Sequence, residues 1–443
     1  MQVSTESIAA FLDTLPGRKR FLIAYSGGLD SHVLLHLMVC LREESGYGIR
    51  AAHVNHNIQR ESRDWAGHCR DTCRALGVEM AVIDVDAGRA GKESPESRAR
   101  RKRYAALEGI LAEGEVLLTA HHRDDQVETL LLRLFRGSGV MGLASMRAVR
   151  PFAKGLHARP LLQHTREQLS AYAGNNGLDW IEDPSNADTR LDRNFVRHEV
   201  LPVIKNRWPS VDLPVTRTIR IFSETQELLD DVARQDLQVC STQKPDVLAV
   251  DLLKRLSIPR QKNLVRYWCR TLNLPGPDSR SVSRIVAEAI AARHDSNAQV
   301  SWSGAELHRY GNYVQLIVPP GGFDKSSIRV WDFKAPCRLD FGELTAVEGN
   351  GSGLKKELCN GARVEVRYRN GGEKIRLPGR TCRHKLKKLF QETATPPWLR
   401  ERVPLIYVGD RLAMAAGFWT DAHFVAGAGE PSWIINWSYT SNV

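Results

Sequence analysis

FLIAYSGGLDS, residues 21–31, joins a short apolar run to a loop in which a glycine pair is flanked by Ser26 on one side and by Asp30 and Ser31 on the other. FLIAY has the continuous apolar character of a buried strand, and SHVLLHLMVCL (31–41) carries apolar residues at helical spacing. Two adjacent glycines allow a sharp turn that brings backbone N–H groups against an anion. Because a helix N-terminus adds free N–H donors and a partial positive charge, this strand–loop–helix unit predicts a phosphate-binding loop.

The loop also carries two hydroxyl donors, Ser26 and Ser31, and one carboxylate, Asp30. Because a carboxylate repels phosphate unless a divalent cation lies between them, Asp30 is predicted to be a Mg²⁺ ligand. The lysine of the GxxxxGKS/T pattern is missing, which argues against an NTPase that cleaves a γ-phosphate. An ordinary glycine turn would explain Gly27 and Gly28 but not the Ser–Asp–Ser set.

Strand-like and helix-like segments alternate from this loop onward. We expect strands over 21–25, 49–57, 78–85 and 116–122, and helices over 31–41, 62–77, 95–114 and 124–137. Such alternation predicts a doubly wound α/β domain, in which a parallel sheet is covered by helices on both faces. Active sites in these sheets lie at the carboxyl ends of the strands, where the polar runs SGGLDS, HVNHN and HHRDD fall.

The chain has 443 residues, enough for about three domains. We expect the α/β catalytic domain over 1–210, a helical middle domain over 216–320 and a small α+β C-terminal domain over 350–443. The boundaries follow from RWPSVDLP at 207–214, PPGG at 319–322 and EGNGSG at 348–353.

The composition is that of a folded, basic protein. Hydrophobic residues make up 42% of the chain, and 62 Lys and Arg against 51 Asp and Glu give a formal charge of +11. No apolar run reaches about 18 residues, so no membrane span is expected, and the N-terminus lacks the basic start of a secretory signal. The eight scattered cysteines contain no CxxC pair, which is typical of a protein of the reducing cytoplasm.

The hexapeptide SGGLDS resembles the phosphate loop of the PP-loop ATP pyrophosphatases. Those enzymes cleave ATP between its α- and β-phosphates, adenylate a carbonyl-type oxygen and release pyrophosphate. The resemblance implies a PP-loop fold and ATP contacts from Ser26, Gly27, Gly28, Leu29, Asp30 and Ser31. His53, at the end of the second predicted strand, is a further candidate for the adenosine, although a packed strand end explains it equally well.

Four further segments, at 95–104, 119–143, 159–202 and 371–419, are similar to the tRNA(Ile)-lysidine synthetases. The resemblance implies a tRNA-modifying ligase that uses ATP and Mg²⁺ to adenylate the C2 oxygen of the wobble cytidine in a CAU-anticodon isoleucine tRNA. The ε-amine of free L-lysine then displaces AMP and forms a carbon–nitrogen bond, so that the tRNA reads AUA and is charged with isoleucine. The middle domain would contribute to substrate binding.

A cationic amino acid needs acidic groups that hold it and orient its amine. Asp124 and Glu128 are spaced i,i+4 and Asp125 is close to Glu128 at i,i+3, so the three carboxylates lie near one face of a predicted helix. We expect them, with His121, to bind lysine, and Asp125 and Glu128 to act in catalysis. The alternative is capping of the helix N-terminus, for which one carboxylate is enough.

Two arginine pairs complete the candidate catalytic set. RARRKR (98–103) places Arg100 and Arg103 on one helical face, and the family pattern implies that at least one reaches the nucleotide or the activated cytidine. Adenylation builds charge at the α-phosphate, which calls for such a cation. We assign Arg100 and Arg193 to catalysis, and Arg103 and Arg197 to tRNA contacts. A solvated basic face remains the alternative for RARRKR.

Most of the charge surplus lies in one stretch near the C-terminus. Between 355 and 388, 12 Lys and Arg face three Glu, a net charge of +9. Within it HKLKKLF (384–390) predicts a short helix with Leu386 and Leu389 inward. We expect tRNA phosphates to be bound by Arg380, Arg383, Lys385, Lys387 and Lys388. A merely solubilising basic surface is the alternative.

Three other functions fit the sequence less well. A tRNA thiolase would typically use a CxxC pair or iron–sulfur cysteines, and the sequence has no CxxC pair. A catalytically silent nucleic-acid-binding protein would not need the intact SGGLDS and DDQVET motifs, and a small-molecule amide ligase has no use for the basic tail. The sequence leaves the oligomeric state open, a homodimer included.

Overall fold

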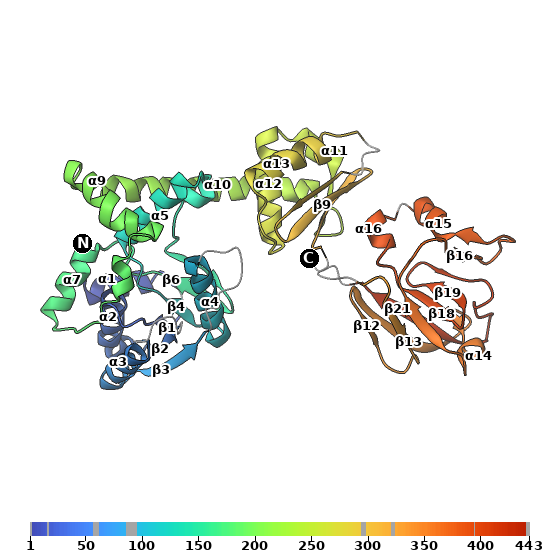
Figure 1. Ribbon diagram of the computed structural model, residues 1–443, viewed down its shortest axis with the longest axis horizontal. Helices are drawn as coiled ribbons and strands as arrows, with labels where there is room; N and C mark the ends of the chain where they lie inside the picture. Colours follow the sequence, from blue (N-terminus) through green and yellow to red (C-terminus); the bar gives the residue numbers. More distant parts are fainter. Residues whose placement is uncertain are drawn as a thin grey trace. The chain divides into compact units, whose positions relative to one another are not determined.

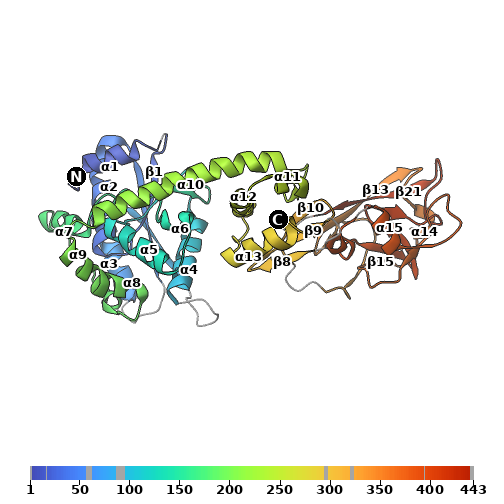
Figure 2. The same ribbon diagram turned by 90° about the horizontal axis from the view of Figure 1, so that it is seen from above.

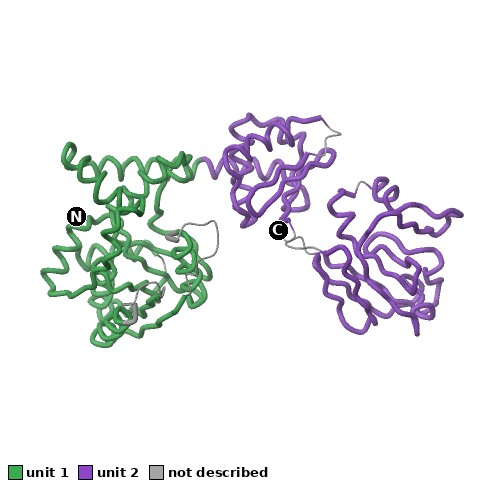
Figure 3. Tube along the Cα trace, viewed as in Figure 1, with its two compact units in different colours: residues 1–228 green, residues 229–443 purple. Residues whose placement is uncertain are grey.

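The computed structural model describes residues 2–15, 17–55, 62–85, 95–293, 298–319, 324–393 and 395–439. The chain divides into two compact units, Met1–Leu228 and Leu229–Val443, which Figure 3 shows in different colours. No helix in the described part of the chain is long and apolar enough to cross a membrane.

The first unit is built on a six-stranded sheet with the strand order β3-β2-β1-β4-β6-β5 (Figure 1). All neighbouring strands are parallel except the edge pair β5 and β6. The strands are β1 (Arg20–Ala24), β2 (Gly48–Asn55), β3 (Glu79–Asp84), β4 (Val116–Leu118), β5 (Val149–Phe152) and β6 (Gly155–Ala158). The predicted doubly wound fold is confirmed, and β5 and β6 extend it beyond the four predicted strands.

Helices cover both faces of this sheet because its strands are apolar on both sides. Phe21 and Ile23 of β1 pack into one core, and Leu22 between them packs into another. The first core receives side chains from α1 (Thr5–Leu12), α2 (Leu29–Ser45), α3 (Ser62–Ala75) and α7 (Arg166–Asn175), and the second from α4 (Pro95–Ile110).

The strand order reverses at β1, whose neighbours are β2 and β4. The loops that leave the carboxyl ends of β1 and β4 therefore open the crevice in which sheets of this kind bind ligands. The first of these loops carries SGGLDS and begins α2, and the second leads into α5 (Arg123–Phe135). The topology thus brings two of the predicted polar runs to one edge of the sheet.

A helical layer borders this edge. It contains α6 (Val140–Leu143), α8 (Asp192–Phe195), the π-helical turn η2 (Val196–Val200) and α9 (Leu201–Arg207), preceded by the 3₁₀ turn η1 (Pro184–Ala187). Val127 of α5 packs with Val196 and Leu201, which fixes η2 and α9 against α5. The helix α10 (Asp212–Cys240) follows, and Figure 2 shows it as one long helix.

The second unit begins with a region that has its own core. Its helices are α11 (Val250–Arg255), α12 (Ile258–Thr271) and α13 (Ser279–Arg284), the last continued by the π-helical turn η3 (Ile285–Ile290). They pack on an antiparallel sheet of order β7-β10-β9-β8, formed by β7 (Val247–Ala249), β8 (Gln299–Trp302), β9 (Ala305–Tyr310) and β10 (Tyr313–Ile317). The sequence predicts the helices but not the sheet, because most of these strands lack a near-continuous apolar run.

The C-terminal region is mostly antiparallel β-structure. One sheet has the order β11-β15-β18-β19-β20 and another the order β12-β13-β21-β14. Their strands are β11 (Ile328–Val330), β12 (Cys337–Leu339), β13 (Gly342–Asn350), β14 (Leu354–Lys355), β15 (Val364–Arg367), β18 (Leu405–Val408), β19 (Arg411–Ala415), β20 (Trp419–Thr420) and β21 (Pro431–Ser438). The helices are α14 (Lys356–Cys359), α15 (Leu386–Glu392) and α16 (Pro397–Arg400).

A two-stranded hairpin of β16 (Lys374–Ile375) and β17 (His384–Lys385) leads directly into α15. Leu386 and Leu389 are buried in the core beneath α15, while Lys385 and Lys388 are exposed. The predicted orientation of this short basic helix is confirmed.

Candidate active site

The loop after β1 has a backbone shape that only glycine accepts at one position. Gly27 has φ +84°, and a Cβ there would lie 2.9 Å from Sγ of Cys69 and 3.1 Å from Cδ1 of Ile181. Gly28 has φ −79° and caps α2, and its surroundings leave room for a Cβ. Gly27 therefore makes the turn, and Gly28 starts the helix.

The two loop serines hold this shape together. Ser31 Oγ accepts from the backbone N–H of Ser26 at 3.2 Å and donates to the carbonyl oxygen of Gly28 at 3.0 Å. Ser26 Oγ lies 3.0 Å from Ser31 Oγ. The first N–H groups of α2 have no acceptor within the helix. The loop is thus organised before any anion arrives, which is what a phosphate site requires.

Asp30 lies in the first turn of α2 and has one unsatisfied oxygen. Its Oδ1 is buried and has no hydrogen-bond partner, and its Oδ2 lies 3.6 Å from Nε2 of His122. No group of three or more His, Cys, Asp or Glu forms a metal cage in the described residues. A single carboxylate oxygen fits Mg²⁺, which keeps several waters and shares its coordination with phosphate oxygens.

His122 joins the phosphate loop to α5. This buried ring lies 3.6 Å from Asp30, 3.6 Å from Asp124 and 3.5 Å from Asp125. Burial by itself would lower the pKa of His122, but these three carboxylates raise it to about 10. The sequence HHRDD does not reveal this contact, since two adjacent histidines give no sign of which one faces inward.

Asp124 accepts hydrogen bonds from other groups of the protein. Its Oδ1 accepts from Nζ of Lys205 at 2.8 Å, and its Oδ2 accepts from the backbone N–H of Arg166 at 2.9 Å. Burial opposes ionisation, but hydrogen bonds from His122, Lys205 and Arg166 hold the pKa of Asp124 well below its usual range. In this arrangement Asp124 ties α5 to α7 and α9.

Asp125 and Glu128 form a buried cluster with Arg193 and Arg197. Arg193 donates from Nε to Glu128 at 2.8 Å and from Nη2 to Asp125 at 2.9 Å. Arg197 donates from Nε to Glu128 at 2.6 Å and from Nη2 to Asp125 at 3.4 Å. Burial would raise the pKa of Asp125, but His122 and Arg193 lower it to about 2.

The sequence assigns these two arginines different roles, and the structure places them side by side on α8 and η2. The predicted contact of Arg197 with the tRNA stays a prediction. Each of the two arginine side chains keeps 22% of its surface exposed.

The other predicted residues of the first unit have contacts of their own. His121 is half-buried, with Nδ1 2.8 Å from Oγ1 of Thr119. His53 is buried and donates from Nδ1 to the carbonyl oxygen of Tyr25 at 3.0 Å, so it supports the end of β1. On α4, Arg100 and Arg103 are exposed, and the guanidinium of Arg100 lies 5.2 Å from the ring centre of Tyr104.

Ion pairs divide the basic C-terminal stretch into two parts. Its first cations are paired with glutamates, Lys355 with Glu430 at 2.9 Å and Lys356 with Glu348 at 2.6 Å. The same holds for Arg363, Arg367 and Arg369, whose partners are Glu365 and Glu373. Within the described residues, no ion pair involves Lys374, Arg376, Arg380, Arg383, Lys385, Lys387 or Lys388. The unpaired charge is therefore concentrated on the β16–β17 hairpin and α15.

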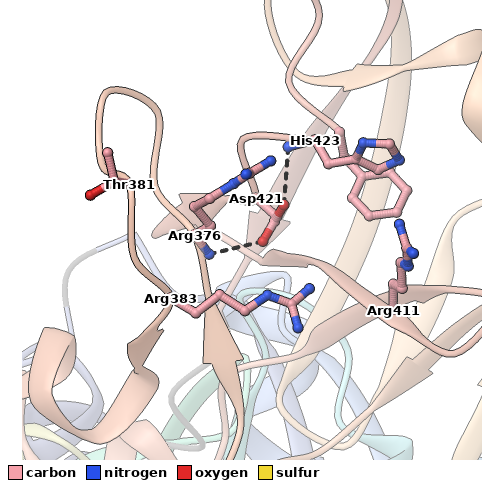
Figure 4. Close-up of a pocket in the computed structure, with 7 residues that line it drawn as sticks. Arg376, Thr381, Arg383, Arg411, Asp421 and His423 are labelled. Carbon is pink, nitrogen blue, oxygen red and sulfur yellow. Dashed lines mark hydrogen bonds between the residues drawn. The ribbon is translucent and has the colours of Figure 1, made fainter.

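A pocket of about 380 Å³ opens beside this hairpin (Figure 4). Its lining residues are Arg376, Thr381, Arg383, Arg411, Asp421, His423 and Phe424. Asp421 accepts the backbone N–H groups of Arg376 at 2.8 Å and His423 at 3.0 Å, so its carboxylate is occupied by the backbone. The sequence does not single out Arg376 or Arg411 as site residues. Arg411 comes from β19, outside the charge-rich stretch, so only the fold brings it to Arg383.

A phosphate loop at the switch point of a parallel sheet, joined to an acidic cluster clamped by arginines, defines a nucleotide-binding enzyme of the PP-loop class. Residues 1–204 match the model of a PP-loop domain, residues 248–315 a TilS substrate binding domain and residues 364–437 a TilS substrate C-terminal domain. The chain belongs to the family of the tRNA(Ile)-lysidine synthases, as its relatives show.

The tRNA(Ile)-lysidine synthase of Methylococcus capsulatus is 38% identical over 99% of this chain and 100% of its own length. That of Coxiella burnetii is 38% identical over 97% of this chain and 96% of its own. Among solved structures, the U34-tRNA thiolase NcsA of Methanococcus maripaludis aligns with a TM-score of 0.43 at 16% identity, over 49% of this chain and 77% of that one.

Proposed function

We propose that this protein is a tRNA-modifying ligase that uses ATP to adenylate the C2 oxygen of the wobble cytidine in CAU-anticodon isoleucine tRNA. Free L-lysine then displaces AMP through its ε-amine and forms lysidine. The observation that supports this best is the junction at His122, which places Asp30 of the phosphate loop beside Asp125 of the acidic cluster. A nucleotide-activating loop and a site for a cationic amino acid therefore share one crevice.

The phosphate loop would hold ATP. The free N–H groups at the start of α2 would bind its phosphates, and the shape fixed by Gly27, Ser26 and Ser31 would present them. Asp30, whose buried Oδ1 has no protein partner, would hold Mg²⁺, which would offset the charge of the leaving pyrophosphate. His53 would support the phosphate loop from the protein interior, because its Nδ1 already donates a hydrogen bond to the carbonyl oxygen of Tyr25.

The acidic cluster would hold the lysine side chain. The carboxylates of Asp125 and Glu128 are shared between Arg193 and Arg197. When the α-phosphate of ATP attracts these guanidinium groups, carboxylate oxygens become free for the ε-ammonium of lysine. The amine must lose a proton before it attacks, and a carboxylate or water has to take that proton. The same arginines would stabilise the charge that builds on the α-phosphate.

The β16–β17 hairpin, α15 and Arg411 would hold the body of the tRNA. The cations of the hairpin and α15 form no ion pairs in the described residues, so a phosphate does not have to displace a carboxylate from them. Such contacts are electrostatic and position the nucleic acid without reading its sequence. Because the reaction draws on tRNA and ATP, we place it in the cytoplasm.

The direct test is an incorporation assay with purified enzyme, ATP, Mg²⁺, labelled lysine and the CAU-anticodon isoleucine tRNA. We expect lysine in the tRNA, with one AMP and one pyrophosphate released for each lysine, and no release without that tRNA. A tRNA whose wobble base is uridine is the control for cytidine. Uptake of another amino acid in place of lysine would contradict the proposal.

A further inference from the structure

Behind His121, a chain of hydrogen bonds runs into the protein. Oγ1 of Thr119, at the end of β4, lies 2.8 Å from Nδ1 of His121 and 2.8 Å from Nε2 of His157. Thr119 and His157 are buried, and His157 sits on the neighbouring strand β6. Thr119 is the first residue of the family-like segment 119–143, whereas His157 lies outside all four family-like segments, and the sequence does not predict β6 itself.

At the inner end of this series of hydrogen bonds, each donor and acceptor can be assigned. Nδ1 of His157 faces Nη2 of Arg159 at 3.2 Å and Nε of Arg150 at 3.3 Å. A guanidinium group can only donate, so Nδ1 of His157 must accept and carries no proton. The proton of the neutral ring is then on Nε2, which donates to Oγ1 of Thr119.

The assignment of donors and acceptors continues through Thr119 to His121 in the active site. A threonine hydroxyl has one proton, and its oxygen already accepts from His157. The remaining neighbour is Nδ1 of His121, which accepts the hydrogen bond that the hydroxyl donates. If Nδ1 of His121 carried a proton instead, the buried hydroxyl of Thr119 would have no acceptor for its own among the described residues, which is unfavourable.

Both rings are held neutral by their surroundings. Burial lowers the pKa of His121 to about 3, with Arg159, Arg100 and Arg193 acting in the same direction and only Asp125 opposing them. Burial and the nearby cations Arg159 and Arg150 lower the pKa of His157 to about 2. A neutral His121 with a bare Nδ1 has its proton on Nε2, the ring nitrogen that has no partner in the described part of the chain.

We propose that Thr119 and His157 are positioning residues that fix His121 as an Nε2–H hydrogen-bond donor to an oxygen of the substrate. His121 then cannot take the proton of the lysine ε-ammonium, which leaves that step to a carboxylate of the acidic cluster or to water. The oxygen acceptors that the reaction offers are the cytidine O2, the α-phosphate and the lysine carboxylate. This assignment rests on the proposed function for the identity of the acceptor, but not for the tautomer.

The tautomer can be measured without any reaction. Two-bond ¹H–¹⁵N spectra of the full-length protein with ¹⁵N-labelled histidine distinguish a protonated ring nitrogen from a bare one, and the signals missing from His121→Gln and His157→Gln assign the two rings. We expect both rings neutral with the proton on Nε2 between pH 6 and 8. An Nδ1–H tautomer or a charged ring at His121 would overturn the proposal, even if lysidine synthesis is confirmed.

The role in turnover is tested at Thr119. Thr119→Val removes the hydroxyl at nearly constant shape, and we expect kcat to fall at least about 10-fold with little change in the KM for ATP. Thr119→Ser restores the hydroxyl and should restore kcat and the His121 tautomer together. An unchanged kcat in Thr119→Val, at an unchanged melting temperature, would contradict the positioning role. If Thr119→Val does not fold, the wild-type spectra still test the His121 tautomer, and Thr119→Ser still tests whether the hydroxyl alone maintains kcat and that tautomer.

Discussion

At the scale of single residues, the phosphate loop depends on one glycine more than on its neighbour. Gly27 adopts a left-handed conformation that side chains rarely accept, and a Cβ there meets Cys69 and Ile181. Gly28 has an ordinary φ of −79°, and a Cβ there would make only ordinary van der Waals contacts with Ser26 and Ile181. The sequence motif presents the two glycines as equivalent, and the backbone distinguishes them.

Gly27→Ala should therefore destabilise the protein, whereas Gly28→Ala should not. We expect the free energy of unfolding to fall by about 1–3 kcal/mol in Gly27→Ala, because the strained conformation and the contact with Cys69 Sγ must both be accommodated. Urea unfolding of the two variants beside the wild type measures this difference. Equal losses in both variants would show that the left-handed turn does not explain why glycine is needed at position 27.

Asp30 should be needed for adenylation but not for tRNA binding. Asp30→Asn keeps the shape of the side chain and removes the charge of the buried Oδ1, which has no protein partner. We expect pyrophosphate release to fall at least about 100-fold, with the Kd for tRNA unchanged within about twofold. The matched control is Asp192→Asn, which neutralises an exposed aspartate paired with Arg136. Wild-type turnover of Asp30→Asn at limiting Mg²⁺ would refute the metal role.

At the scale of elements, Glu115 fastens the start of β4 to its surroundings. Its carboxylate accepts from Nε of Arg50 on β2 at 2.7 Å and from the backbone N–H of Ala112 at 2.9 Å. Burial raises the pKa of Glu115, but Arg50 and Ala112 outweigh it and lower the pKa below its usual value. These bonds hold β4, which ends just before Thr119 and the histidines, in register with its neighbours.

Glu115→Gln should lose stability only above the pH at which the free carboxyl group ionises. A pKa depressed in the folded state contributes stability above the unfolded pKa of about 4.3, and the contribution disappears as pH falls through the folded value. We expect a loss of about 1–3 kcal/mol at pH 7 that shrinks below about pH 4. Unfolding by urea at several pH values measures it, and a loss independent of pH would point to packing instead.

Some elements could be predicted from the sequence and others could not. Strands β1 to β4 and helices α2 to α5 were predicted, because long apolar runs and helical periodicity are local signals. Strands β5 and β6, and the sheet β7-β10-β9-β8, were not, because most of these strands lack a near-continuous apolar run and form through partners distant in the chain. His157 belongs to this second group, so no local pattern reveals its link to His121.

At the scale of the whole molecule, the net charge is +11, but not all of the basic side chains are equally free to bind phosphate. Lys355, Lys356 and Arg363 lie in the basic stretch, yet each is paired with a glutamate. Lys385, Lys387 and Lys388 are exposed and take part in no ion pair within the described residues. Two sets of three cations in the same region therefore differ in whether phosphate can reach them freely.

Neutralising the second set should weaken tRNA binding far more than neutralising the first. With Lys385, Lys387 and Lys388 all changed to Gln, we expect the slope of log K against log salt to fall by about 1 for each tRNA phosphate that the variant no longer binds. The matched control changes Lys355, Lys356 and Arg363 to Gln, with the same change in net charge. If both triple variants bind equally, overall charge rather than the hairpin and α15 holds the tRNA.

The sequence by itself determined the class of fold, the phosphate loop and the kinds of residue in the active site. These are carried by short motifs and periodic patterns, whose physical causes act between near neighbours. The tertiary structure decided how those residues are paired. It placed His122 between Asp30 and Asp125, set Arg197 beside Arg193 on Glu128, and brought Arg411 to Arg383. Ion pairs and hydrogen bonds depend on distances of a few ångströms between distant segments, and only the packed chain sets those distances.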